Sequence, residues 1–322
     1  MVINDRPTLA RRTIIVRAEE IKMRKRPSRR TLSIQEDWDL SAEEYATFAS
    51  RNNFYRHTAK TMLSLAEIEP GMVVVDLACG TGSVTEAILG EPYGKAIKII
   101  AIDSSPQMLA CAQRRLACPN VEFHCEKAEN LGKVLLTPVD RILCNAAFWM
   151  FDTPRVLSKI QRILKPTGKC LMGLRHRFTL SEMRALYAED TLFRMILKEK
   201  AIRGYASTKW PHDGKPQSDP GPKKNFGLLS VDDFNLKISK KERIAIYCTA
   251  KDHIDFLRIP VMAKASSLLA GVPDEDVREI LDAVQNQVES MEVTPPPIPW
   301  HICVLEVRDK HRRPRGARVG EC

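Results

Sequence analysis

Two features that define whole classes of protein are missing from this 322-residue sequence. It holds no run of 18 or more apolar residues, so we expect no transmembrane helix. Its nine cysteines form no C-x-x-C pair, which leaves a zinc site without local support, and we predict no metal. Because the start also lacks the apolar core of a secretory signal, we predict a reduced, cytoplasmic protein.

Net positive charge is confined to the two ends of the sequence. The net charge is +10, yet residues 1–30 hold ten basic against three acidic residues, and residues 307–322 hold six against two. The remainder is near neutral, which disfavours a catalytic surface that grips nucleic acid. We expect residues 1–35 and 311–322 to be flexible basic segments, either solvated tails or contacts for nucleic acid or a membrane surface.

Apolar runs alternate with amphipathic stretches through the first half of the sequence. Residues 72–78 and 97–103 are apolar over most of their length, which is typical of strands buried on both faces. We predict further strands at 121–125, 141–146 and 169–174, and helices at 83–89, 105–116 and 154–164. Strands separated by helices of this length predict a parallel, doubly wound α/β sheet.

The second half of the sequence departs from this alternation. Strands are predicted at 243–250 and 301–307, with helical and Pro/Gly-rich blocks around them. Ligands of open α/β sheets bind beyond the carboxyl ends of the strands, which inserted helices would cover as a lid. The predicted units are a helical cap at 36–70, a Rossmann-like core at 71–175, an insertion at 176–241 and final strands with a helical lid at 242–310. In the cap, Ser41 followed by Glu44 predicts a capping box.

The stretch VVVDLACGTGSVT, residues 73–85, joins a predicted strand to a predicted helix through two glycines. Gly80 and Gly82 let the backbone approach a ligand, and the helix start offers free N–H groups. A dinucleotide fingerprint has a third glycine and binds a pyrophosphate there, but this sequence has Thr85 at that place. Asp76 would repel a pyrophosphate and suits a ligand with an ammonium or sulfonium group.

Asp103 ends the second predicted strand, 23 residues after Gly80. An acid at this place can accept hydrogen bonds from both ribose hydroxyls of an adenosine-bearing ligand. The alternative is a helix N-cap, since the sequence SSP follows. We favour the ribose interpretation because strand, loop and acid recur at the expected interval.

Four motifs follow one another over roughly residues 40–175: VVVDLACGTGSVT, AIDSSPQMLACAQRR, VEFHCEKAENL and RILCNAAFWMFD…RILKPTGKCLMGL. As an ordered set they resemble the class I S-adenosylmethionine-dependent methyltransferases, most of all their ubiquinone- and menaquinone-biosynthesis-like, small-molecule branch. The resemblance implies a Rossmann-like seven-stranded sheet whose last strand is antiparallel, with helical lid insertions. It also implies S-adenosyl-L-methionine as the cofactor.

The same resemblance implies which residues hold the cofactor. They are Asp76, Ala78 and Gly80 at its methionyl part, Gly82 at the turn, Asp103 at the ribose, Ser104 and Ala128 at the adenine, Asn145 and Ala146 at its amino-acid end, and Tyr45 from the helical cap. Tyr45 has an equally good interpretation as a core aromatic. Lys127 stands where the family often has an acid that bonds the adenine amino group. Either Glu129 takes over that bond, or the amino group is left to water and backbone.

A methyltransferase needs a base only where its acceptor must lose a proton. His176 follows the last predicted strand of the core, between Arg175 and Arg177, and is the candidate catalytic residue. His253 and His301 are weaker candidates. The segment FWMF, residues 148–151, is either a pocket wall for an apolar or aromatic substrate or part of the core.

Four functions are compatible with these patterns. The first is methyl transfer to an oxygen, nitrogen or carbon atom of a small molecule, which the near-neutral body favours. The second is an RNA or protein methyltransferase that grips its substrate through the basic ends. A dinucleotide-dependent oxidoreductase is disfavoured by Asp76 and by the missing third glycine. A partner-binding protein that keeps the cofactor fold is the fourth.

Overall fold

The computed structural model describes residues 33–175, 190–205, 231–266 and 268–308, which belong to one compact unit. Of the basic segments predicted at the two ends, all but residues 33–35 lie outside this described part. Among the described residues, no helix is both long and apolar enough to cross a bilayer.

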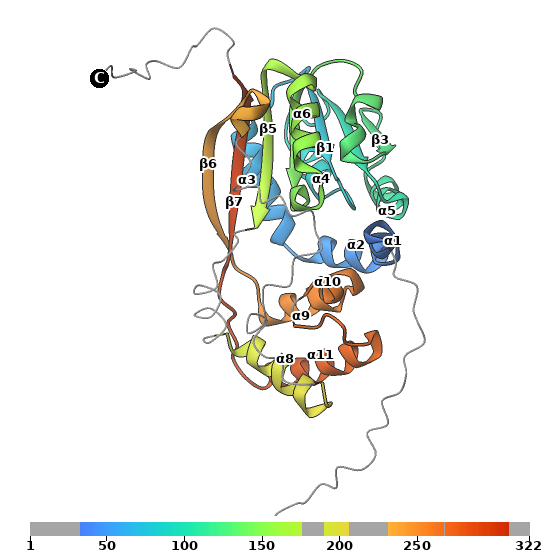
Figure 1. Cartoon of the computed structure of the whole chain (residues 1–322), viewed down its shortest axis with the longest axis vertical. Coiled ribbons are helices and arrows are strands. Elements are labelled where there is room, and N and C mark those ends of the chain that lie inside the picture. Colours follow the sequence, from blue (N-terminus) through green and yellow to red (C-terminus); the bar gives the residue numbers. More distant parts are fainter. Residues whose placement is uncertain (1–32, 176–189, 206–230, 267, 309–322) are drawn as a thin grey trace, which may run out of the picture. The chain divides into compact units, whose positions relative to one another are not determined.

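Within the described part, seven strands form one sheet in the order β3-β2-β1-β4-β5-β7-β6 (Figure 1). The strands are β1 (Val73–Leu77), β2 (Lys98–Asp103), β3 (Val121–Cys125), β4 (Val139–Asn145), β5 (Leu164–Arg175), β6 (Leu236–Ile246) and β7 (Ile298–Val307). The first five pair in parallel, whereas β7 lies antiparallel between β5 and β6. The predicted seven-stranded Rossmann-like sheet with an antiparallel last strand is confirmed.

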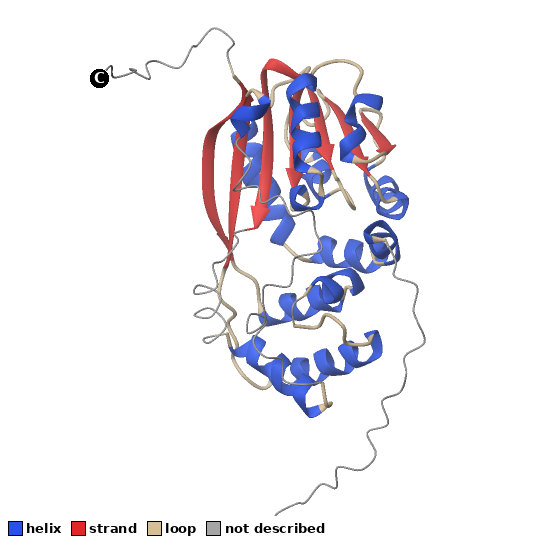
Figure 2. Ribbon diagram, viewed as in Figure 1, coloured by secondary structure: helices blue, strands red, loops and turns tan. Residues whose placement is uncertain are grey.

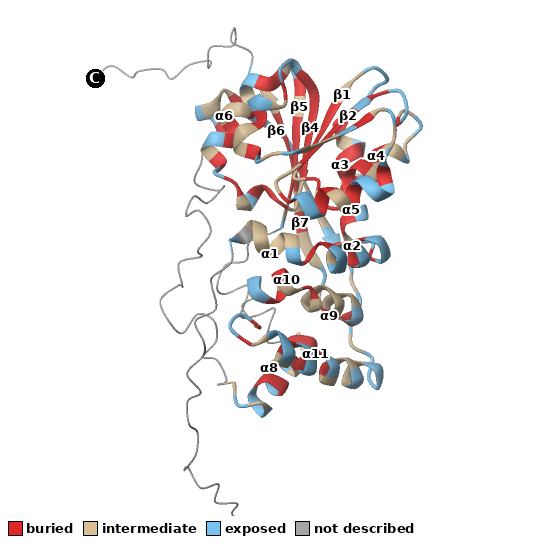
Figure 3. Ribbon diagram, turned by 90° about the vertical axis from the view of Figure 1, so that its right-hand side faces the viewer, coloured by how far each residue is buried: buried red, intermediate tan, exposed pale blue. Residues whose placement is uncertain are grey.

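Consecutive residues of the central strands pack into separate hydrophobic cores on the two faces of the sheet. Val74 packs in one core with α3 and α4, whereas Val75 packs in the other with α6. Both valines are fully buried, as expected for strands covered on both faces, and Figure 3 shows this burial along the sheet. The covering elements are α3 (Phe54–Ala66), α4 (Ser83–Leu89), α6 (Thr153–Ile163) and the short helices η1 (Ala128–Lys133), η2 (Phe148–Met150) and η3 (Val231–Phe234).

The N-terminal helices α1 (Ile34–Leu40) and α2 (Ala42–Arg51) pack against α5 (Pro106–Leu116). The capping box in this region belongs to Ser33 and Glu36 at the start of α1. The capping box predicted for Ser41 and Glu44 is wrong, because the Ser41 side chain makes no cap hydrogen bond. Its hydroxyl instead accepts the N–H of Val261 at 3.1 Å, which joins the cap to the C-terminal half.

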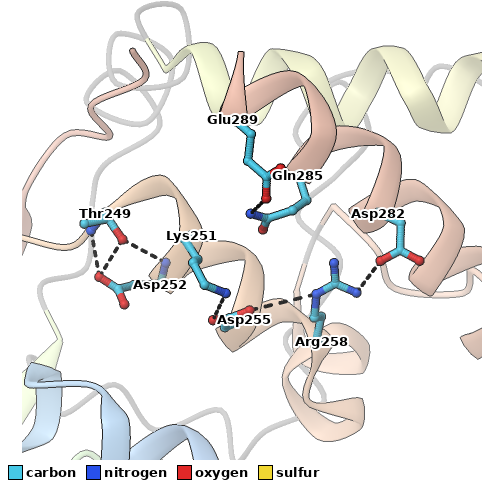
Figure 4. Close-up of polar contacts among 8 residues, drawn as sticks. All are labelled: Thr249, Lys251, Asp252, Asp255, Arg258, Asp282, Gln285 and Glu289. Atoms are coloured by element: carbon cyan, nitrogen blue, oxygen red, sulfur yellow. Dashed lines mark hydrogen bonds and ion pairs between the residues drawn. The ribbon is translucent and has the colours of Figure 1, made fainter. Parts of the chain in front are cut away.

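The helices of the C-terminal half form a core of their own, separate from the sheet. They are α8 (Thr191–Ile202), α9 (Ala250–Arg258), α10 (Pro260–Ala265) and α11 (Asp274–Glu289). Apolar residues of α8, α9 and α11 pack together, with Ile196, Ile254 and Ile280 almost fully buried. At the surface, Arg258 of α9 pairs with Asp282 of α11 at 2.6 Å (Figure 4).

These lid helices contact the N-terminal cap beyond the carboxyl ends of the parallel strands, as Figures 1 and 2 show. The rings of Phe48 in α2 and Phe256 in α9 have centroids 5.5 Å apart. Lys264 of α10 forms an ion pair with Asp37 of α1 at 2.5 Å. Cap and lid therefore cover together the edge of the sheet where ligands of this fold class bind.

Strand β6 begins earlier than its sequence indicated. The prediction placed a strand at 243–250, but β6 runs from Leu236 to Ile246 and α9 begins at Ala250. Most of the first half of β6 is exposed, and Lys237, Lys240 and Lys241 lie in it. An exposed strand with so many charges lacks the apolar run on which the prediction depended.

Candidate cofactor-binding site

The loop between β1 and α4 is held against the end of β2. The N–H of Gly80 donates to Oδ2 of Asp103 at 2.8 Å. Ala78, Gly80 and Gly82 all have positive φ angles, of 55°, 54° and 90°. These left-handed residues turn the chain sharply and place its backbone beside the carboxyl ends of two adjacent strands.

Gly82 lies where the start of α4 approaches α5. It is the N-cap residue of α4. A Cβ atom at this position would lie 2.4 Å from Cδ1 of Leu116 in α5. The positive φ therefore favours glycine here, and any larger residue would also have to displace the end of the Leu116 side chain.

The carboxylate of Asp76 is buried at the end of β1, with 1% of the residue exposed. Its Oδ2 accepts the backbone N–H of Thr85 at 2.9 Å and the Thr85 hydroxyl at 2.7 Å. Burial raises the pKa of Asp76 to about 7, against the lowering effect of these two bonds and with a further increase from the charge of Asp103. The threonine that replaces a third glycine thus ties α4 to this carboxylate.

Asp103 lies at the end of β2, and each of its oxygens accepts a backbone N–H. Oδ1 accepts from Ser105 at 2.9 Å, and Oδ2 accepts from Gly80 as described above. The N-cap of α5 is Ser105, so the alternative interpretation of Asp103 as the cap is wrong. Burial raises the pKa of Asp103, the backbone bonds lower it, and nearby Asp39 raises it.

The charge of these carboxylates is not offset by a cation. In the described part of the chain, Asp76 and Asp103 accept bonds from backbone N–H groups and from the Thr85 hydroxyl, and neither forms an ion pair with a lysine or arginine. Asp39 of α1 adds a third carboxylate, which accepts the Ser105 hydroxyl at 2.5 Å. A ligand with a sulfonium or ammonium group would offset this negative field, and ribose hydroxyls could donate to the remaining lone pairs of Asp103. The residues present therefore fit S-adenosylmethionine.

The residues predicted at the adenine lie at the ends of β2 and β3. Ser104 is partly buried, and Ala128 is buried at the first position of η1. Lys127 is exposed. Oε1 of Glu129 accepts the N–H of Asp152 at 2.8 Å and so holds the start of α6. A bond from the adenine to Glu129 stays a prediction.

Asn145 and Ala146 join the end of β4 to its neighbours. The Asn145 side-chain NH₂ donates to the Thr58 hydroxyl of α3 at 2.7 Å. Its Oδ1 is buried and has no hydrogen-bond partner among the described residues. Ala146 has a φ of 63° and donates its N–H to the carbonyl of Gly173 at 3.0 Å. Contact of either residue with the amino-acid end of the cofactor stays a prediction.

Tyr45 packs among aromatic rings at the same edge of the sheet. Its ring centroid lies 5.5 Å from that of Trp38 and 5.7 Å from that of Tyr55. Burial raises the pKa of Tyr45 well above its usual value, and Tyr55 and the charge of Asp103 raise it further. The ring is thus part of an aromatic cluster. Because the charge of Asp103 affects the pKa of its phenol, Tyr45 lies near the end of β2.

Comparison with known families identifies the core of the chain. Residues 74–168 match the profile of the family described as a methyltransferase domain. These residues form a methyltransferase domain. The matched residues begin in β1, end within β5 and include Asp76 and Asp103.

Relatives and solved structures resemble the methyltransferase domain and parts of its surroundings. Malonyl-[acyl-carrier protein] O-methyltransferase of Bacillus cereus is 30% identical over 171 residues, or 52% of this chain and 62% of that protein. Trans-aconitate 2-methyltransferase of an Azoarcus species is 33% identical over 132 residues, or 41% and 48%. The chain thus spans less than two thirds of the length of these relatives. A methyltransferase of Thiobacillus denitrificans, solved with S-adenosylhomocysteine, matches 87% of this chain and 100% of its own at 15% identity, with a TM-score of 0.47.

The acceptor side of the methyltransferase domain lies only partly within the described residues. His176, the predicted catalytic residue, and Arg177 are outside them. Phe148 and Phe151 are buried in the core that contains α6, so the pocket-wall interpretation of FWMF is wrong for these two rings. Trp149 between them is 48% exposed.

His253 of α9 has a buried environment that its sequence context did not indicate. Its Nε2 is buried and has no hydrogen-bond partner in the described ranges. Burial lowers the pKa of His253, Asp190 and Asp252 raise it, and Arg175 lowers it. Arg175, Asp190 and His253 come from three distant segments, so no local sequence signal could have grouped them.

Proposed function

We propose that this protein transfers the methyl group of S-adenosyl-L-methionine to an oxygen, nitrogen or carbon atom of a small-molecule acceptor by in-line displacement. The observation that carries the proposal is the pair of carboxylates, Asp76 and Asp103, beside a glycine loop and without a compensating cation. A pyrophosphate would add negative charge to this field, whereas a sulfonium and an ammonium group would offset it.

The cofactor supplies an electrophile that is already activated, so the protein's task is binding and alignment. We assign the ribose hydroxyls to Asp103 and the positively charged end of the cofactor to the field of Asp76. Cap and lid exclude water from the carboxyl edge. Tyr45 and Tyr55 keep their protons, because burial raises the pKa of both phenols, so neither serves as the base.

The acceptor is proposed to be small and acidic. Both named relatives support an acidic acceptor, since a malonyl group and aconitate carry carboxylates; aconitate also supports a small one, whereas the malonyl group is attached to a carrier protein. The near-neutral body of the chain gives no support for a nucleic-acid acceptor. Membership of the ubiquinone- and menaquinone-biosynthesis-like branch stays a prediction.

Calorimetric titration with S-adenosylhomocysteine and with a nicotinamide dinucleotide tests the cofactor. We expect heat of binding from the first ligand only. Asp103→Asn should weaken that binding about tenfold or more, because hydrogen bonds to a charged group are lost. Asp274→Asn, which removes an exposed carboxylate at the start of α11, is the matched control and should bind like the wild type. Binding of the dinucleotide alone would overturn the proposal.

The alternative of an RNA or protein methyltransferase depends on the basic ends of the chain. Removal of residues 1–30 deletes ten basic residues. We expect the shortened protein to methylate a small acid as fast as the full chain. A loss of activity together with a loss of RNA binding would instead favour the macromolecular acceptor.

A further inference from the structure

A cavity of about 340 Å³ is lined by none of the residues predicted to bind the cofactor. Its wall comes from the junction of α2 and α3, the end of β6 and the start of α9, and includes Arg51, Phe54, His57, Tyr247 and Asp252. This volume is within the range of small-molecule sites. The cavity lies between cap, sheet and lid, where an acceptor must enter if these helices cover the transfer site.

The basic side chains of the wall lack partners, whereas its acid is already engaged. Arg51 and His57 are exposed, and neither side chain has an ion pair or hydrogen bond within the described part of the chain. Asp252 accepts the N–H and the hydroxyl of Thr249, both at 2.8 Å, and so caps α9 (Figure 4). Helix α3 contributes no acid at all. The free donors of the cavity therefore favour an anion.

Phe54 connects this cavity to the transfer site. Its ring lines the cavity and lies edge-on to Tyr55 and Trp300, with centroids 4.7 Å and 5.4 Å away. Tyr55 contacts Tyr45, and the charge of Asp103 raises the pKa of the Tyr45 phenol. Phe54 thus links the wall of the cavity to the end of β2 through the rings of Tyr55 and Tyr45.

We propose that this cavity binds an anionic group, a carboxylate or a phosphate, of the molecule that is methylated. The Arg51 guanidinium would pair with two of its oxygens, the His57 ring would donate to it, and Phe54 with Tyr247 would flank the adjoining carbons. The inference rests on the proposed function and extends it to the class of substrate. It assigns Arg51 and His57 as specificity-determining residues remote from the reacting atoms.

The test is calorimetric titration of the full chain, with and without S-adenosylhomocysteine, using tricarballylate, its neutral trimethyl ester and glycerol 3-phosphate as probes. We expect saturable binding of one anion and none of the ester, and the anion that binds distinguishes carboxylate from phosphate. Arg51→Gln should weaken that binding about tenfold, since a charged hydrogen-bonded pair is lost. Arg56→Gln is the matched control: it removes the same charge from the exposed face of α3, outside the cavity wall, and should change binding by less than about twofold.

Binding of neither anion overturns the inference, as does an equal loss in Arg51→Gln and Arg56→Gln, which would indicate only the general charge of the surface. Circular dichroism of each variant checks that it is folded. Titration of the same samples with S-adenosylhomocysteine separates the two proposals. If the cofactor product binds and no anion does, the cavity assignment alone is wrong. If an anion binds at Arg51 and the cofactor product does not, the methyltransferase proposal is wrong and the anion site stands.

Discussion

Thr85 donates both its backbone N–H and its hydroxyl to a single oxygen of the buried Asp76 carboxylate. These two bonds stabilise the ionised form, yet burial is the larger effect and raises the pKa of Asp76 to about 7. The protein thus keeps an acid at a site where its charge is costly. A cationic ligand bound beside Asp76 would lower the free energy that is needed to keep this buried carboxylate ionised.

The first prediction concerns the pH dependence of stability. The folded-state pKa of Asp76, about 7, lies above the unfolded value of 3.8, so the folded chain binds this proton more tightly. The free energy of unfolding should therefore fall as pH rises from about 4 to about 7. Asp76→Asn should remove this component, by a few kcal/mol at most. Urea denaturation across this range measures both proteins, and parallel curves for the two would contradict the assignment.

The second prediction concerns cofactor affinity. Protonation below about pH 7 removes the charge of Asp76 that attracts the positive end of the ligand. The affinity of the wild type for S-adenosylhomocysteine should therefore decrease as pH falls through that value. In Asp76→Asn, the affinity should be lower and nearly independent of pH. The ratio of the wild-type affinity to the variant affinity removes the effect of the ligand's own titration. An affinity ratio that stays constant from about pH 5 to about pH 8 would show that the Asp76 carboxylate does not lie near the positive charge of the ligand.

The third prediction concerns the left-handed residue in the glycine loop. Ala78 has a φ of 55°, which costs an alanine about 1 kcal/mol. Ala78→Gly should therefore raise the free energy of unfolding by up to about 1 kcal/mol. Ala147→Gly is the control, because Ala147 has a φ of −122° and the same change there should destabilise the fold. Thermal unfolding of both variants measures the difference in sign, and destabilisation by both would count against backbone strain at Ala78.

The fourth prediction concerns the bond between cap and lid. Ser41→Ala leaves the buried N–H of Val261 without its acceptor, which costs about 1–3 kcal/mol. Ser50→Ala, the same change at an exposed position of α2, should alter stability by less than about 0.5 kcal/mol. Denaturant unfolding gives both values. Equal effects would mean that the Ser41 bond does not hold the lid.

The core of the fold could be predicted because its signals are local. The strand that ends at Leu77, the glycine loop and helix α4 follow from consecutive residues, and α4 has the predicted bounds. The position of Asp103 beside the loop followed from the parallel order of strands.

Contacts between distant segments could not be predicted in this way. The partner of Ser41 lies 220 residues further along the chain. The cavity likewise takes Arg51 from α2 and Tyr247 from beyond β6, and neither residue carries a motif. Such contacts depend on how the cap and the lid pack against each other. The packing of distant segments leaves no local pattern in the sequence.

Within the described ranges, the last strand of the sheet order, β6, pairs with β7 alone, and no described strand pairs with its other side. Free strand edges recruit strands from other molecules unless something discourages it. Here Lys237, Lys240, Lys241 and Arg243 line the exposed strand, so two copies that met along it would bring like charges together. The charged side chains that kept this strand from being predicted would therefore oppose pairing of two copies along it.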